Sequence, residues 1–312
     1  MNVINKLEAN FVWIIILFSA IALFYPTPFI FFKPYITLFL AIIMFGIGYT
    51  LDLKAFKDCW QHRWIIILAA IVKYLLMPLT AFIIAHILRL PLYDVIGLIV
   101  VSTCPGGTAA NVMSYLAKAN VALTVILTFG TTLLAPLLMP SLVYLFLHKE
   151  IQVPFLEMVK NILEIVTLPL IIGLILKRLL GAKAHYIKMA LPLVSIFAIA
   201  IIVACIMALS HSKILEFPLL IIIAVLLLNS LGYVYGYLFG KITKLSLANT
   251  QAIVFEYGMQ DSGLGVIIAN SFFGPASALA SALYSLIQNI TAPILIKVIY
   301  KRKLNKILDE SR

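Results

Sequence analysis

Residues 95–117 read VIGLIVVSTCPGGTAANVMSYLA, an apolar run that STCPGGT (residues 102–108) interrupts at its centre. A helix needs about 20 apolar residues to cross a bilayer, so the run is long enough to span one. Pro105 removes a helical hydrogen bond, and Gly106 and Gly107 allow a tight unwound stretch. Because unpaired backbone groups are costly in hydrocarbon, such a break survives where it lines a site or a cavity. The stretch predicts a membrane protein with a site near mid-membrane.

A second interrupted run lies at residues 247–273, LANTQAIVFEYGMQDSGLGVIIANSFF, with its break expected at residues 256–263. The break holds two carboxylates and an amide, those of Glu256, Asp261 and Gln260. A charged carboxylate at this depth costs about 2.5–3.5 kcal/mol, so a cation is expected to accompany it. Each resumed helix presents free amides that suit an anion, and each interrupted end presents carbonyls that suit a cation. The two breaks therefore predict a hard-cation site beside an anion site.

The composition of the whole chain is that of a multi-span membrane protein. Of its 312 residues, 63% are hydrophobic and 11% are charged, whereas a soluble domain has about 45–50% and 25%. These values exclude an ordinary water-soluble enzyme and a disordered chain. The net charge of +11 comes from basic residues between apolar runs, which indicates cytoplasmic loops and no nucleic-acid partner. The three cysteines are far apart and form no metal-binding or disulfide pattern.

Ten apolar runs are predicted to cross the bilayer. They are residues 11–25, 35–50, 64–87, 95–117, 121–147, 162–176, 190–209, 217–239, 247–273 and 276–300. With both termini in the cytoplasm, sixteen Lys and Arg residues fall in cytoplasmic segments and five in outer segments. This bias predicts a multi-pass protein of the inner (plasma) membrane with both termini cytoplasmic.

The order of the spans indicates an internal duplication. The interrupted runs are the fourth and the ninth, and Cys104 and Glu256 lie 152 residues apart, close to half the chain. Since five spans is an odd number, the second half must enter the bilayer from the opposite side. We therefore expect an all-α fold of two inverted repeats, residues 1–155 and 156–312.

Two long motifs carry a resemblance to a known family. STCPGGTAANVMSYLAKANVALTVILT (residues 102–128) and EYGMQDSGLG (residues 256–265) resemble the two signatures of the bile acid:sodium symporter family, with weaker matches at residues 44–52 and 73–82. The resemblance covers nearly the whole chain. It implies a panel domain (spans 1, 2, 6 and 7) and a core domain (spans 3–5 and 8–10) in which spans 4 and 9 cross. It also implies a secondary transporter that carries an organic anion with sodium by alternating access.

The resemblance further implies which residues bind sodium, the coupling ion, with no other cofactor expected. The first sodium site falls on Ala110, Asn111, Thr124, Thr128 and Glu256. The second falls on Glu256, Tyr257, Met259, Gln260 and the position of Lys73. Family members typically have a serine in place of Ala110 and a glutamine in place of Lys73. Because an ammonium has no lone pair for sodium, one sodium ion is expected and the second site is in doubt.

The substrate contacts implied by the resemblance lie at the starts of the resumed helices. They are Thr108, Asp261 and Ser262, with Gln288 and Asn289 of span 10 within reach. The usual residue in place of Asp261 is asparagine. Lys73 either pairs with Asp261 or Glu256, and so replaces a sodium ion, or it binds the substrate carboxylate directly. Pantoate, 2-keto acids and bile-salt-like anions fit the resemblance equally well.

Other functions stay open at this point. The carrier could be proton-coupled or sodium-independent, with Lys73 as its internal cation, and a channel is a further alternative. An enzyme is not expected, because the sequence has neither a G-x-S-x-G nor an H-E-x-x-H motif. The expected partners are a small organic anion, sodium and the lipid bilayer, and we expect a monomer. The direction of transport and the sodium stoichiometry are left open.

Overall fold

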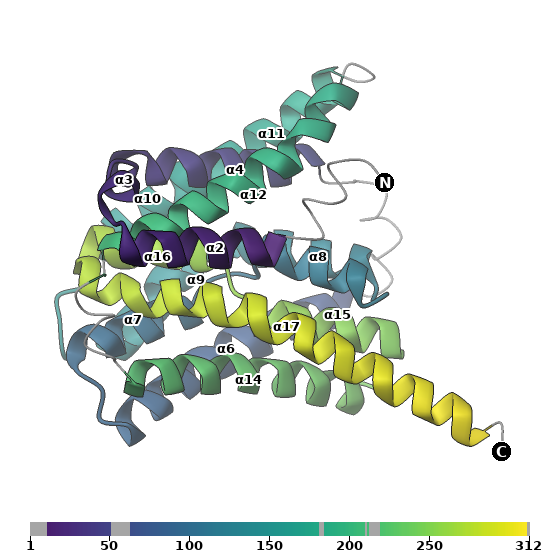
Figure 1. Cartoon of the computed structure of the whole chain (residues 1–312). Helices are drawn as coiled ribbons and strands as arrows, with labels where there is room; N and C mark the ends of the chain where they lie inside the picture. The colour runs from purple at the N-terminus through teal and green to yellow at the C-terminus, as the bar shows by residue number, and fades with distance from the viewer. Residues whose placement is uncertain (1–10, 51–62, 181–183, 210, 212–218, 311–312) are drawn as a thin grey trace.

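The computed structural model describes residues 11–50, 63–180, 184–209, 211 and 219–310. Within these ranges every named element is helical, as the composition predicts (Figure 1). The two chain ends and the loop charges of Lys54, Lys57, Lys183 and Lys213 lie outside the described residues.

The helices follow the predicted apolar runs closely. The first half holds α2 (Phe11–Phe24), α3 (Thr27–Ile30), η1 (Lys33–Tyr35), α4 (Ile36–Thr50), α6 (Arg63–Ile87), α7 (Leu92–Ser102), α8 (Thr108–Leu116) and α9 (Val121–Leu147). The second half holds α10 (Phe155–Ile162), the π-helical turn η3 (Leu163–Thr167), α11 (Leu168–Leu180), α12 (Ala184–Leu209), α14 (Leu219–Ile242), α15 (Leu247–Gly258), α16 (Ser262–Phe273) and α17 (Pro275–Glu310).

Six helical segments of the described residues are long and apolar enough to cross a membrane. They are Thr27–Thr50, Arg63–Ile87, Val121–Leu147, Phe155–Leu180, Leu219–Ile242 and Pro275–Val298. Several of the remaining predicted spans are shorter apolar helices, among them α7 and α16. The chain is thus an all-α, multi-pass membrane protein.

One group of helices is formed by α2, α4, α11 and α12, in the upper part of Figure 1. Helix α4 packs on α11 and α12, and α12 also packs on α2. Glycines let α4 and α11 approach closely, because a Cβ on Gly48 would strike the Leu170 carbonyl and one on Gly173 would strike the Phe45 carbonyl. Small residues give membrane helices this close contact in the absence of a hydrophobic driving force.

A second group contains α6–α9 and α14–α17, which pack on one another; α6, α7 and α14 lie in the lower part of Figure 1. Helix α14 meets α15 along Gly232, Gly236 and Gly240, which are spaced four residues apart on one face. A Cβ at the first two would strike the α15 backbone, and one at Gly240 would strike Thr250. This contact fixes the position of α15, the helix that ends at the second break.

Both predicted helix breaks are present. The first lies between Ser102 at the end of α7 and Thr108 at the start of α8. The second is shorter than the sequence indicates, because α15 continues through Gly258 and α16 begins at Ser262. Glu256 is therefore a helical residue near the end of α15 and does not lie in the unwound stretch.

The two breaks pair with each other as a short antiparallel bridge. The Gly107 amide donates to the Met259 carbonyl at 2.9 Å, and the Asp261 amide donates to the Pro105 carbonyl at 2.9 Å. A Cβ on Gly107 would lie 2.6 Å from the Gln260 carbonyl oxygen, so this approach requires glycine. The pairing gives partners to backbone groups that the breaks leave free.

Candidate functional site

The carboxylate of Glu256 is the centre of a buried polar cluster. Glu256 is fully buried. The Thr128 hydroxyl donates to its Oε2 at 2.7 Å, and the Thr131 Oγ1 lies 3.2 Å from its Oε1. The Lys73 ammonium lies 3.4 Å from the same Oε1. Side chains from α6 and α9 thus contact a carboxylate from α15 in the buried space between these helices.

Gly106 joins this cluster to the first break. A Cβ on Gly106 would overlap the Glu256 carboxylate, so the carboxylate lies directly against the unwound backbone. The Gly106 amide donates to Thr131 Oγ1 at 3.2 Å. The position of the carboxylate and the shape of the break therefore depend on each other.

Lys73 pairs with Glu256, one of the two partners that the sequence allows. Its side chain is 1% exposed, and its hydrogen bond among the described residues goes to Glu256 and not to Asp261. Removing one partner from a buried ion pair leaves an uncompensated charge, which destabilises a protein by about 3–5 kcal/mol. Lys73 supplies Glu256 with a cation that belongs to the chain itself.

The structure places the expected ligands of the first sodium site in different contacts. Thr128 contacts Glu256, but the Thr124 hydroxyl hydrogen-bonds to the Ser114 hydroxyl at 2.8 Å instead. The Asn111 Oδ1 is buried and accepts no hydrogen bond from the described residues. Ala110 is buried, and its amide donates to the Gly107 carbonyl at 3.0 Å.

These oxygens fit a hard cation, which prefers carboxylate, carbonyl and hydroxyl ligands. Helices α8, α9 and α15, which carry them, pack on one another. The Asn111 Oδ1 is a buried acceptor that a bound cation would satisfy. The resemblance did not include Ser114, yet its hydroxyl hydrogen-bonds to Thr124, one of the expected ligands.

Tyr257 and Met259, two of the expected ligands of the second sodium site, already have partners. The Met259 carbonyl accepts the Gly107 amide, and the Tyr257 carbonyl accepts the Gln260 side-chain amide at 3.0 Å. The Gln260 Oε1 is buried and has no donor among the described residues. With Lys73 on Glu256, this part of the core holds an ammonium near the place where a second sodium is expected.

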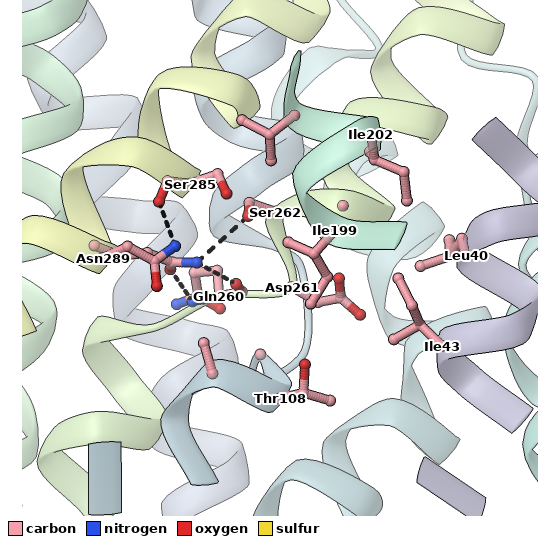
Figure 2. A pocket seen from close by; sticks show the side chains of 15 residues that line it. Leu40, Ile43, Thr108, Ile199, Ile202, Gln260, Asp261, Ser262, Ser285 and Asn289 are labelled. Carbon is pink, nitrogen blue, oxygen red and sulfur yellow. Dashed lines mark hydrogen bonds between the residues drawn. The ribbon is translucent and has the colours of Figure 1, made fainter. Parts of the chain in front are cut away.

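A pocket lies where the two breaks meet, between the two groups of helices. Its empty volume is about 450 Å³, part of it open to solvent. Figure 2 shows its polar side with Thr108, Asp261, Ser262 and Asn289. Gln288 lines the pocket too, so all the predicted substrate residues except Lys73 are found there. The opposite side is apolar and comes from α4 and α12: Leu40, Ile43, Ile199, Ile202 and Val203.

Gln288 holds the second break in place. Its Oε1 accepts the Gln260 amide at 2.9 Å, and its Nε2 donates to the Gln260 carbonyl at 3.2 Å and to Ser262 Oγ at 3.4 Å (Figure 2). Asn289 donates to the Ser285 carbonyl of its own helix at 2.7 Å. Gln288 therefore shapes the pocket wall in addition to lining it.

Sequence reasoning missed Thr131, Asn229 and Tyr284. Asn229 Nδ2 and the Tyr284 hydroxyl donate to the Gly258 carbonyl at 2.7 and 3.0 Å, which satisfies the end of α15. Thr131 lies three residues after Thr128, so extending the helical periodicity would have found it. For Asn229 and Tyr284 the sequence offers no comparable signal.

Comparisons with known proteins identify the family of this chain. Residues 37–217 match the family described as "Sodium Bile acid symporter family". A Bacillus subtilis (strain 168) protein named "Uncharacterized sodium-dependent transporter YocS" is 40% identical over 284 residues, which cover 91% of this chain and 88% of that protein. An Arabidopsis thaliana protein named "Probable sodium/metabolite cotransporter BASS1, chloroplastic" is 32% identical over 272 residues, which cover 87% and 68%. On the extent of these matches, the chain belongs to the sodium bile acid symporter family.

Proposed function

We propose that this protein is a secondary active transporter that couples sodium to the movement of a small organic carboxylate. The single observation that carries the proposal is the pairing of the two breaks, Gly107 with Met259 and Asp261 with Pro105. The Glu256 cluster adjoins these breaks and the pocket opens on them. A cation at the cluster and a solute in the pocket would thus contact the same unwound backbone.

Each part of the site has a role in this proposal. Oxygens of Asn111, Ser114, Thr124, Thr128 and Glu256 would hold one sodium ion. The start of α8, at Thr108, would face the substrate carboxylate, because its amides and helix dipole favour negative charge. Gln260 bonds to the Tyr257 carbonyl next to Glu256 and also lines the pocket, where Gln288 holds it. These two residues would carry a change at the cation cluster to the pocket.

The position of the pocket between two groups of helices supports alternating access. One wall comes from α4 and α12, and the other comes from α8, α16 and α17. Rocking of one group against the other would expose the pocket to each side in turn. We propose that the groups correspond to the panel and the core of ten spans in two inverted repeats, with both termini cytoplasmic.

A second candidate rests on the 3.4 Å contact between Lys73 and Glu256. In this candidate the ammonium replaces a coupling ion, and the carrier is sodium-independent or uses protons. The contact supports it because Glu256 already has a cation. The unpartnered Asn111 Oδ1 favours the sodium-coupled form, since a bound cation gives that atom a partner.

The test is uptake into proteoliposomes with an imposed sodium gradient. The substrates are labelled pantoate, pyruvate and taurocholate, each assayed with sodium, with choline, and with a pH gradient alone. We expect saturable, sodium-dependent uptake of at least one of the small carboxylates. Uptake that is indifferent to sodium and follows the pH gradient would support the second candidate. Non-saturable flux without exchange would contradict any carrier.

A further inference from the structure

The charge of the pocket is unusual for a site that receives a carboxylate. Among the described residues that line it, Asp261 is the one with a charged side chain, and none is a lysine, arginine or histidine. Lys73, a cation of the neighbouring cluster, is paired with Glu256. The pocket itself therefore carries a single negative charge and offers only helix ends and amides to an anion.

Two further side chains give the pocket oxygen atoms without donors. The Gln260 Oε1 and the Asn289 Oδ1 are both buried, and neither accepts a hydrogen bond from the described residues. Both residues are 1% exposed and line the pocket. A buried polar atom without a partner costs free energy, so such atoms indicate a ligand that donates hydrogen bonds.

The N-termini of α8 and α16, the two helices that follow the breaks, differ in their capping. Asp261 caps α16, because its Oδ1 accepts the Leu264 amide at 3.1 Å. No side chain caps the nine-residue helix α8, and Thr108 and Ala109 at its start line the pocket. A carboxylate of a ligand is favoured at the start of α8, whereas the start of α16 already has one.

The sum of the buried charges also favours a substrate that carries both a carboxylate and an ammonium. Lys73 and Glu256 cancel, and the charge of one sodium ion at the Glu256 cluster would balance that of Asp261 in the sum. A substrate that is only an anion would then add an uncompensated charge in the membrane core, which is costly. A substrate with one carboxylate and one ammonium adds no net charge.

We infer that the transported solute is a zwitterion, an aliphatic carboxylate that also bears an ammonium group. This inference rests on the proposed transport function and names its substrate class. The carboxylate binds at the start of α8. The ammonium binds at Asp261 and the unpartnered oxygens of Gln260 and Asn289. The aliphatic part faces the apolar wall of α4 and α12.

The test compares acids that differ by a single amino group. The pairs are leucine with 4-methylpentanoate, 4-aminobutyrate with butyrate, and 6-aminohexanoate with hexanoate, which vary the spacing of the two charges. Binding to the purified full-length protein is measured calorimetrically in the presence of sodium. In at least one pair the amino-bearing acid should bind about tenfold more tightly, as expected for a charge-assisted hydrogen bond.

Asp261→Asn tests which residue is responsible. Asparagine also caps helices well, so the start of α16 should be retained. The variant should lose the preference for the amino-bearing acid and bind the plain acid at least as well as wild type. Asn289→Leu should weaken binding of the amino-bearing acid selectively. Glu157→Gln, which removes an exposed carboxylate of α10 outside the pocket, is the matched control and should change nothing.

The outcomes separate this inference from the proposed function. If the plain acid binds as well as its amino partner in every pair, or if Asp261→Asn keeps the preference, the zwitterion assignment is wrong. Sodium-driven uptake of a plain carboxylate would in that case leave the transport function standing. If no acid of either kind binds and no sodium gradient drives uptake, both are overturned.

Discussion

The ammonium of Lys73 lies 3.4 Å from the Glu256 carboxylate, and the two side chains, 183 residues apart in the chain, are each 1% exposed. Glu256 occupies the position that the resemblance assigns to both sodium sites. It thus has beside it a cation that is itself a residue of the chain, the ammonium of Lys73. Glu256 is neutralised within the fold, so sodium is not required to stabilise its charge. This arrangement limits the number of sodium ions that the core can take.

Lys73→Gln tests the pair directly. Without sodium, the variant leaves the Glu256 charge buried and alone, and we expect a loss of about 3–5 kcal/mol in the free energy of unfolding. Sodium should restore part of this loss by occupying the vacated position, so the melting temperature of the variant should rise with sodium more than that of wild type.

The control for Lys73→Gln is Lys160→Gln. Lys160 forms an exposed pair with Glu164 at 3.9 Å, and such pairs contribute less than about 1 kcal/mol. Equal effects of the two substitutions, or a sodium response of Lys73→Gln no larger than that of wild type, would defeat this account of the pair.

Gly106→Ala should disrupt the Glu256 cluster. The added Cβ would overlap the carboxylate, so the first break or α15 must shift. We expect lower stability and loss of sodium-dependent stabilisation in thermal unfolding. Gly130→Ala on α9 is the matched control, because a Cβ there meets nothing within 4 Å and alanine favours a helix by about 1 kcal/mol over glycine. Normal sodium dependence in Gly106→Ala would refute the coupling of break and carboxylate.

Thr131→Val tests a residue that the sequence analysis overlooked. Its Oγ1 accepts the Gly106 amide and contacts Glu256 Oε1, both at 3.2 Å. Removing it leaves a buried amide without its partner, and a loss of about 1–3 kcal/mol is expected in denaturant unfolding. Thr132→Val removes a hydroxyl whose bond goes to the Thr128 carbonyl of the same helix and should cost less. A larger loss of stability in Thr132→Val than in Thr131→Val would contradict a role of Thr131 in the site.

The topology is open to cysteine labelling. In a background without Cys59, Cys104 and Cys205, single cysteines at Lys118 and Lys244 should react with an impermeant reagent from the cytoplasmic side. A cysteine at Gln152, beyond the other end of α9, should react from outside. The Asn120 amide donates to the Ala248 carbonyl at 3.0 Å, which brings the first two loops together. Labelling of Lys118 and Gln152 from one side would contradict the inverted arrangement.

The sequence predicts the helices and both breaks because these depend on local features. Apolar runs of sufficient length fix the spans, and Pro105 with its two glycines fixes the first break. The second break is shorter than its polar residues indicate. A helix tolerates Glu256 when partners from other helices satisfy the carboxylate, and α15 continues to Gly258.

The sequence predicts contacts between helices less well than it predicts the helices themselves. Periodicity places Thr124 and Thr128 on one face of α9, but it does not show that Ser114 of α8 lies next to Thr124. The choice between Asp261 and Glu256 as partner of Lys73 depends on how α6 is rotated against α15, which the sequence leaves open. The expected substrate residues Thr108, Asp261 and Ser262 lie around the pocket, because the breaks themselves position them there.

The most direct test of the central claim is the sodium dependence of thermal unfolding in wild type and in Lys73→Met/Glu256→Gln. The double substitution removes both buried charges together, so neither is left alone. If Glu256 is the sodium ligand, sodium should raise the melting temperature of wild type in the manner of one bound ion, with choline as the control salt. The double variant should fold and show no such rise. An equal rise in the folded double variant would contradict sodium binding at Glu256.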